Sequence, residues 1–206
     1  MLAMSQVTQN RKKSFSSFTY KEAFKYLGLN ELKRWTIEAE PVPVSDFFQQ
    51  RLERLQRFDL ESLEVSKTLL IDAICEEGLE TSHHLKVWKG PYLEGEDVCG
   101  NADYLIAERR AYLELPYVCV IEAKKDNFEQ GAAQCLVEMK VCQWLHQQQG
   151  KEIDSYGIVT NGEGWKFYRL LVNGEVSESL LTGVGDMSML LGRLRVFFEL
   201  CERNLS

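Results

Sequence analysis

The sequence has 206 residues, of which 45% are apolar and 27% charged, so it is long and apolar enough to bury a core of its own. It has no apolar signal-peptide segment and no run of about 18 apolar residues that could span a membrane, so we expect a cytoplasmic protein without a membrane partner. The formal net charge of −7 argues against nonspecific coating of nucleic acid, which depends on Lys and Arg, but allows a nuclease whose carboxylates await a metal.

The cysteines are scattered, and several lie inside apolar runs. No Cys-x-x-Cys pair and no histidine at ligand spacing accompanies them, which argues against a zinc site. Their pattern is typical of small buried side chains in a reducing compartment.

The first part of the chain predicts helices and one extended segment. Apolar residues at helical spacing predict a helix over Thr19–Trp35. Residues 40–44 contain two prolines and should be extended, and Ser45 can cap a helix that runs to Phe58. We expect residues 1–60 to form a helical N-terminal arm packed on a core domain of residues 61–206.

The rest of the chain alternates between helix-like and strand-like patterns. This order is typical of an α/β protein with a central mixed β-sheet flanked by helices. The predicted helices cover 61–77, 127–149 and 186–203, and the predicted strands cover 84–88, 101–107, 117–124, 154–160 and 165–172.

A Glu-x-Lys triplet occurs three times, at Glu31, Glu122 and Glu138, so the spacing alone carries no information. Residues two apart project from the same face only in a strand, whereas on a helix they diverge by about 200°. Only Glu122 and Lys124 lie on a predicted strand, where they follow a run of apolar residues. Both charges therefore emerge where a buried strand leaves the core, and burying either alone would be costly.

Asp103, on the preceding predicted strand, supplies a further acid. An antiparallel return would place Asp103 beside Glu122. Two carboxylates suit a hydrated Mg²⁺, which prefers oxygen ligands and keeps several waters, and Lys124 could position and activate one of them. A structural salt-bridge cluster at a strand end is the alternative that spacing alone leaves open.

Three segments together resemble the PD-(D/E)xK nuclease superfamily: Asn101-Ala-Asp-Tyr-Leu-Ile106, Val120-Ile-Glu-Ala-Lys-Lys125 and Glu129-Gln-Gly-Ala-Ala-Gln134. Within the superfamily, this motif order resembles the branch that includes the N-terminal domains of type I restriction motor subunits and small stand-alone relatives. The resemblance covers about residues 61–170 and implies a restriction-endonuclease-like core. Ala102 stands where the motif has proline.

The resemblance also implies a role for each matching residue. Asp103 and Glu122 match the metal-binding acids, and the Ala123 carbonyl a further ligand. Lys124 matches the catalytic lysine, and Gln134 a glutamine that the following helix places near the site. Glu64 matches an acid of the first core helix, with Glu61 and Asp72 as rival candidates. Separately, Gln130 lies four residues before Gln134 on one helical face, so it could face the same cleft or belong to a solvated polar stripe.

The expected function is Mg²⁺-dependent hydrolysis of phosphodiester bonds, with Mn²⁺ as a substitute metal and DNA as the expected partner. Many nucleases of this type pair to cut two strands, so the resemblance allows a homodimer. The first alternative is a catalytically silent binding or structural module of the same fold, acting with a partner protein or nucleic acid. The second is another class of hydrolase, for which the sequence has no motif.

Overall fold

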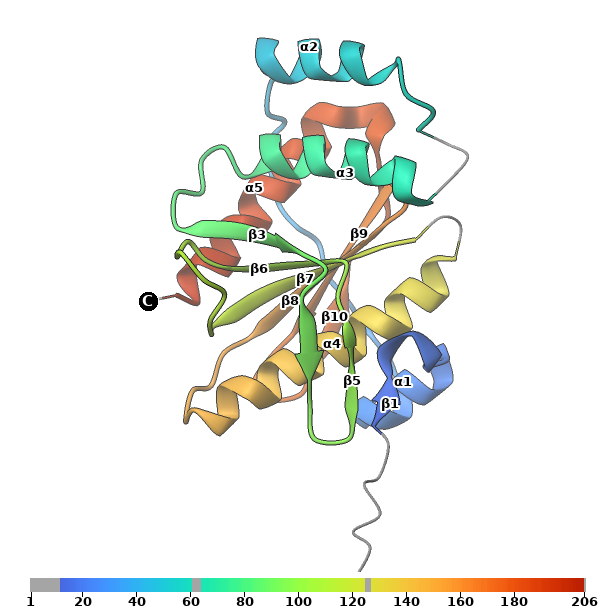
Figure 1. Ribbon diagram of the computed structural model, residues 1–206, viewed down its shortest axis with the longest axis vertical. Coiled ribbons are helices and arrows are strands. Elements are labelled where there is room, and N and C mark those ends of the chain that lie inside the picture. The colour runs from blue at the N-terminus through green and yellow to red at the C-terminus, as the bar shows by residue number, and fades with distance from the viewer. Residues whose placement is uncertain (1–11, 61–63, 125–126, 206) are drawn as a thin grey trace, which may run out of the picture.

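A mixed β-sheet lies between two layers of helices in the computed structural model, which describes residues 12–60, 64–124 and 127–205 (Figure 1). The expected mixed sheet with helices on both faces is confirmed. Across the sheet the strand order is β2 (Lys33–Arg34), β10 (Val176–Glu178), β9 (Gly164–Leu170), β8 (Ser155–Thr160), β7 (Tyr117–Ala123), β6 (Tyr104–Glu108) and β3 (Leu85–Lys89). A short strand, β11 (Thr182–Gly183), also pairs with β9.

The centre of the sheet is the parallel pair β7 and β8. Parallel neighbours need a crossover connection, and here it is the long helix α4 (Phe128–Gln148). The partners of this pair on either side, β6 and β9, run antiparallel to it. Strand β7 is buried along almost its whole length, as its continuous apolar run predicted.

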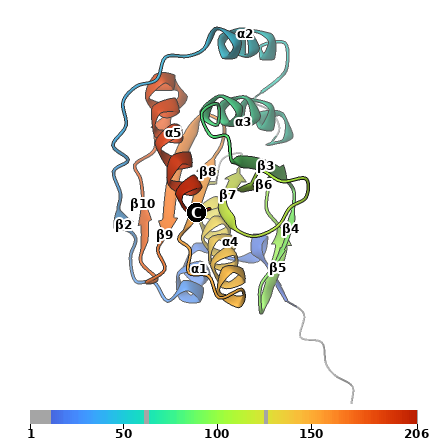
Figure 2. The ribbon, with the colours of Figure 1, turned by 90° about the vertical axis from the view of Figure 1, so that its left-hand side faces the viewer.

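The helices divide between the two faces (Figure 2). Helices α3 (Glu64–Gly78) and α5 (Met187–Arg203) pack against each other on one face, and α2 (Asp46–Leu55) packs on the outer side of α3. Helix α4 covers the other face, with α1 (Tyr20–Leu27) against it. No helix in the described ranges is long and apolar enough to cross a lipid bilayer.

The N-terminal segment supplies strands as well as helices. Strand β1 (Lys13–Ser14) pairs with β5 (Val98–Asn101), which also pairs with β4 (Tyr92–Glu94) to form a second, small sheet. A single 3-10 turn, Phe15–Ser17, follows β1, and its Phe15 is buried. Strand β2 pairs in parallel with β10 at the edge of the main sheet.

The predicted helix over Thr19–Trp35 is wrong in its second half. It starts as expected, because Thr19 and Glu22 form a reciprocal capping box. It ends at Leu27, because Gly28 adopts a left-handed conformation with φ of 71°. The residues after Gly28 then lead into β2 instead of continuing the helix.

The predicted strand over residues 101–107 is two strands. Strand β5 ends at Asn101 in the small sheet, and β6 begins at Tyr104 in the main sheet. Between them, the Ala102 amide donates to the Pro91 carbonyl and the Asp103 carbonyl accepts from the Gly90 amide. Asp103 therefore lies where the chain passes from one sheet to the other.

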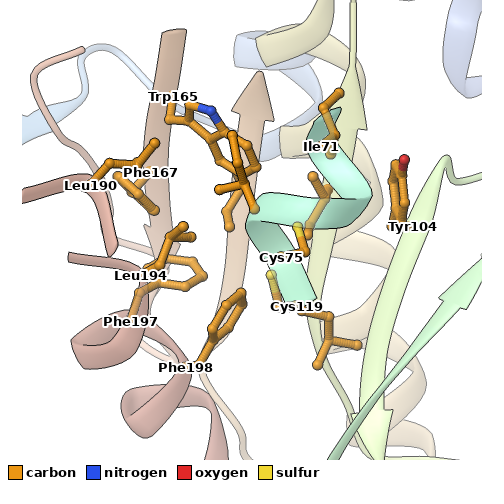
Figure 3. Close-up of a cluster of buried hydrophobic side chains, with 14 of the residues drawn as sticks. Ile71, Cys75, Tyr104, Cys119, Trp165, Phe167, Leu190, Leu194, Phe197 and Phe198 are labelled. Atoms are coloured by element: carbon orange, nitrogen blue, oxygen red, sulfur yellow. The ribbon is translucent and has the colours of Figure 1, made fainter. Parts of the chain in front are cut away.

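The core has two parts, one on each face of the main sheet. On the α3 and α5 face, Trp165, Phe167, Phe197 and Phe198 pack with apolar residues of α3 (Figure 3). On the other face, residues of α4 pack on β6, β7 and β8. Five of the six cysteines are buried, as expected from their pattern: Cys75, Cys119, Cys135, Cys142 and Cys201.

Candidate active site

Asp103 and Glu122 lie side by side at the end of the β6–β7 pair. The antiparallel register pairs Tyr104 with Ile121, so the residue before Tyr104 meets the residue after Ile121. The Asp103 main-chain nitrogen lies 3.5 Å from Glu122 Oε1, and the Ala123 amide donates a hydrogen bond of 2.8 Å to Asp103 Oδ2. The predicted proximity of the two acids is confirmed.

Lys124 completes this group from the position directly after β7. Its Nζ lies 3.1 Å from Glu122 Oε2 and 3.8 Å from Asp103 Oδ2. Glu122 and Lys124 face the α4 side of the sheet, as their spacing in a strand requires. In the other triplets the charges do not meet in this way: Lys33 pairs with Glu175, and Lys140 contacts Gln143.

The burial of the three side chains differs sharply. The Glu122 side chain is fully buried, that of Lys124 is 19% exposed, and that of Asp103 is 35% exposed. The group therefore opens to solvent mainly at Asp103 and Lys124. A ligand in solution could reach the Asp103 carboxylate without any rearrangement of the strands.

Burial raises the pKa of Glu122 to about 7, and the charge of Asp103 acts in the same direction. A hydrogen bond with Glu138 and the ammonium of Lys124 oppose the rise. Among the described residues, Glu122 Oε2 has the ionic contact with Lys124 but no hydrogen bond of good geometry. The Lys124 ammonium is therefore the cation that compensates this buried oxygen.

Gln134 lies behind Glu122 rather than at the solvent opening. Its Nε2 donates a hydrogen bond of 3.0 Å to Glu138 Oε1, and both side chains are buried. Burial raises the pKa of Glu138 well above its usual value, helped by the charge of Glu122 and by a hydrogen bond with it. Gln134 is thus linked to Glu122 through Glu138.

Glu138 is the site residue that the sequence patterns missed. In the sequence it stands out only as part of a Glu-x-Lys triplet, a spacing that carries no information by itself. The available signal was its position four residues after Gln134, which puts both on one face of α4. Gln130, one turn earlier, instead donates to the carbonyls of Ser16 and Phe18 and so ties α4 to the N-terminal segment.

The structure does not describe the side chain of Glu64, the acid expected from the first core helix. The whole of Glu61 also lies outside the described residues. Asp72 is occupied elsewhere: it accepts hydrogen bonds from Lys89 Nζ and from the Tyr104 hydroxyl. Asp72 is therefore held on the α3 side of the sheet, away from the face that carries Glu122.

The donors in this group fit a hydrated divalent cation of the Mg²⁺ type. Two carboxylates converge, one buried and one open to solvent, and Mg²⁺ usually takes one or two protein carboxylates and fills its shell with water. Among the described residues, no group of three or more His, Cys, Asp or Glu could hold a metal ion of any kind, so a cation here would depend on two protein carboxylates at most.

The fold and this group together define a mixed α/β protein with a lysine and two acids converging at the end of a central strand pair. Comparison with protein-family models finds no match. Comparison with curated proteins finds no match either.

Proposed function

We propose that the protein is a Mg²⁺-dependent nuclease that hydrolyses phosphodiester bonds, with DNA as its substrate. The observation that carries the proposal is the convergence of Lys124 Nζ on Glu122, at 3.1 Å, and on Asp103, at 3.8 Å, beside a solvent opening. A structural ion pair would not require a second acid at the mouth of the site.

The order of the elements supports a restriction-endonuclease-like core of the PD-(D/E)xK type. The strand that follows Asp103, the strand with Glu122 and Lys124, and the helix with Gln134 occur in the sequence order of that family's motifs, and they converge in space. In this proposal the core consists of α3, β3, β6, β7, α4 and β8, and the other elements extend it.

Asp103, Glu122 and the Ala123 carbonyl would hold the Mg²⁺, and Mn²⁺ would substitute for it. The bound metal would polarise a phosphoryl oxygen and lower the pKa of a coordinated water. The Ala123 amide orients Asp103 by its hydrogen bond, and Glu138, held by Gln134, orients Glu122 from behind.

Lys124 acts at the solvent side of the two acids. Its ammonium would position the attacking water and offset the negative charge that develops on the phosphoryl oxygens. The new bond forms between the water oxygen and phosphorus, and the bond from phosphorus to the leaving sugar oxygen breaks. Buried residues of β7 and α4, among them Gln134 and Glu138, lie behind Glu122 and keep bulk water away from the charged groups on that side.

The test is cleavage of labelled DNA by the purified protein with Mg²⁺ and with EDTA. The Lys124→Ala variant should lose at least about 100-fold in rate, typical of losing a charge-stabilising group. Lys140→Ala, at the lysine of the Glu-x-Lys triplet on helix α4, is the matched control and should keep the wild-type rate. Activity that survives EDTA, or an unchanged rate for Lys124→Ala, contradicts the proposal, and metal binding without cleavage would favour the silent module.

A further inference from the structure

A second feature opens at the same end of the central strands as the candidate active site. It is a pocket of about 440 Å³, within the roughly 300–1,000 Å³ range of pockets that take small ligands. Its walls come from Arg34 beside β10, from the start of α4, from β9 and from the segment between β10 and β11. The wall residues that matter are Arg34, Phe128, Lys166, Glu178, Leu180 and Leu181. We call this feature the edge pocket.

The edge pocket and Lys124 are linked through the first turn of α4. A side-chain carbon added at Gly131, in that turn, would lie 3.0 Å from Lys124 Cγ. Phe128 begins the same helix, and a side-chain carbon added at Gly164 would lie 3.3 Å from its ring and 3.2 Å from Leu181 Cδ1. Phe128, a wall of the pocket, is thus one helical turn before the glycine against which Lys124 lies.

Strand register gives the same result. Ala123, next to Lys124, pairs with Thr160 at the end of β8, and Thr160 pairs with Trp165 at the start of β9. Lys166, which lines the pocket, follows Trp165 directly. The active-site group and the edge pocket therefore lie at the same end of neighbouring strands, with β8 between them.

The pocket combines apolar side chains with positive charge. Leu180 and Leu181 are 60% and 57% exposed, which is unusual for adjacent leucines. Phe128 supplies an aromatic face beside them. Lys166 is paired with Glu178 at 2.6 Å, so with Arg34 the charged walls sum to +1, in a chain whose net charge is −7.

We infer that the edge pocket receives an unpaired nucleotide of the substrate strand, an inference that rests on the proposed nuclease function. A nucleobase has a flat apolar face suited to Phe128, Leu180 and Leu181, and the phosphate of the nucleotide suits Arg34, since Lys166 is already paired with Glu178. A base inside a duplex is stacked and paired, and would have to leave the stack to enter a pocket. The substrate class is therefore single-stranded or locally unpaired nucleic acid.

The test is binding of a fluorescein-labelled single-stranded 12-nucleotide DNA, followed by anisotropy in EDTA, with the blunt duplex of the same sequence as comparison. The wild-type protein should bind the single strand at least about 10-fold more tightly than the duplex. The paired substitution Leu180→Ser with Leu181→Ser, and separately Arg34→Ala, should each weaken single-strand binding by about 5- to 100-fold, as expected for loss of a stacking or phosphate contact.

Tyr112→Ser is the matched control, because Tyr112 is 64% exposed and lies outside the pocket. It should leave single-strand affinity unchanged. The two leucines are largely exposed, so their substitution should preserve the fold, which circular dichroism would verify. No measurable binding by the wild type, equal affinity for strand and duplex, or unchanged affinity in both pocket variants would overturn the inference.

The two proposals fail in distinguishable ways. If the wild type cleaves DNA with Mg²⁺ but the pocket variants bind the single strand normally, the pocket inference fails alone. If no DNA is cleaved but the pocket variants lose single-strand binding, the nuclease proposal fails and the pocket remains a nucleotide site. Lys124→Ala should lose cleavage and keep single-strand affinity within about threefold, because Lys124 is not a wall of the edge pocket.

Discussion

The main-chain amide of Ala123 donates a 2.8 Å hydrogen bond to the carboxylate of Asp103, the residue directly before β6. The strand that carries Glu122 and Lys124 therefore also orients the second acid. The distance between the two carboxylates is set by backbone pairing rather than by flexible side chains. This arrangement favours a preorganised site over a surface ion pair that forms and breaks freely.

Asp103→Asn should impair cleavage, whereas Asp72→Asn should impair stability. Asp103 is one of two converging acids, so its amide variant should lose at least about 100-fold in rate. Asp72 is bound to Lys89 and the Tyr104 hydroxyl, so its variant should lose stability by about 1–3 kcal/mol while keeping its rate within threefold. Initial rates and urea unfolding of both variants provide the comparison; the reverse pattern would make Asp72 the active-site acid.

Gly131→Ala should impair the site through packing. The added carbon would lie 2.7 Å from Val159 Cγ1 and 3.0 Å from Lys124 Cγ, so α4 or Lys124 must shift. We expect at least a 10-fold loss of cleavage rate, with a melting temperature lowered by a few degrees. Gly185→Ala is the control, since nothing lies within 4 Å of its added carbon. Equal rates for the two variants would show that this contact does not position Lys124.

Gln134→Leu should cost more stability than activity. The change removes the hydrogen bond to Glu138 and leaves a buried carboxyl with fewer partners, for a cost of about 1–3 kcal/mol in urea unfolding. The cleavage rate should fall less than 10-fold, because Gln134 contacts Glu138 and acts on Glu122 only through it. A rate loss as large as that of Lys124→Ala, at unchanged stability, would instead mean that Gln134 touches the substrate.

The metal-free protein should lose stability as the pH rises from about 4.5 to about 7. The folded pKa of Glu122 is raised from 4.5 to about 7, so in this window the folded state keeps a proton that the unfolded state has lost. That difference amounts to on the order of 3 kcal/mol for Glu122 alone. The burial-raised pKa of Glu138 adds to it in the same direction.

Urea unfolding at several pH values in EDTA measures this slope. Glu122→Gln has no proton to lose, so it should be more stable than the wild type at pH 8 and show a shallower decline with pH. The slope that remains should come in part from Glu138. A wild-type protein whose stability rises between pH 4.5 and 7, with Glu122→Gln following the same curve, would contradict the assigned burial.

The placement of Glu122 and Lys124 was predictable because it depends on local pattern. A continuous apolar run predicted a doubly covered strand, and residues two apart on a strand share a face. The position of Asp103 was predictable only approximately, since the break between β5 and β6 depends on pairing with residues near Pro91. The position of Glu138 on the same face of α4 as Gln134 was predictable from their spacing, but its burial against another carboxyl group depends on tertiary packing that the local sequence does not show.

The errors in the N-terminal segment have a similar origin. Gly28 ends α1 in a left-handed conformation, and the apolar residues beyond it continue a helical spacing that the backbone does not follow. Strands such as β1 and β2, of two residues each, are too short to show an alternating pattern. They exist because β5 and β10 offer them a partner.

The most direct test of the central claim is a crystal of the wild-type protein soaked in Mn²⁺, with anomalous diffraction data collected at the manganese edge. We expect one anomalous peak between the carboxylates of Asp103 and Glu122, about 2.0–2.3 Å from an oxygen of each, and no such peak in Asp103→Asn crystals soaked in parallel. Occupied manganese sites elsewhere with none between these two residues, or a wild-type site retained in Asp103→Asn, would contradict it.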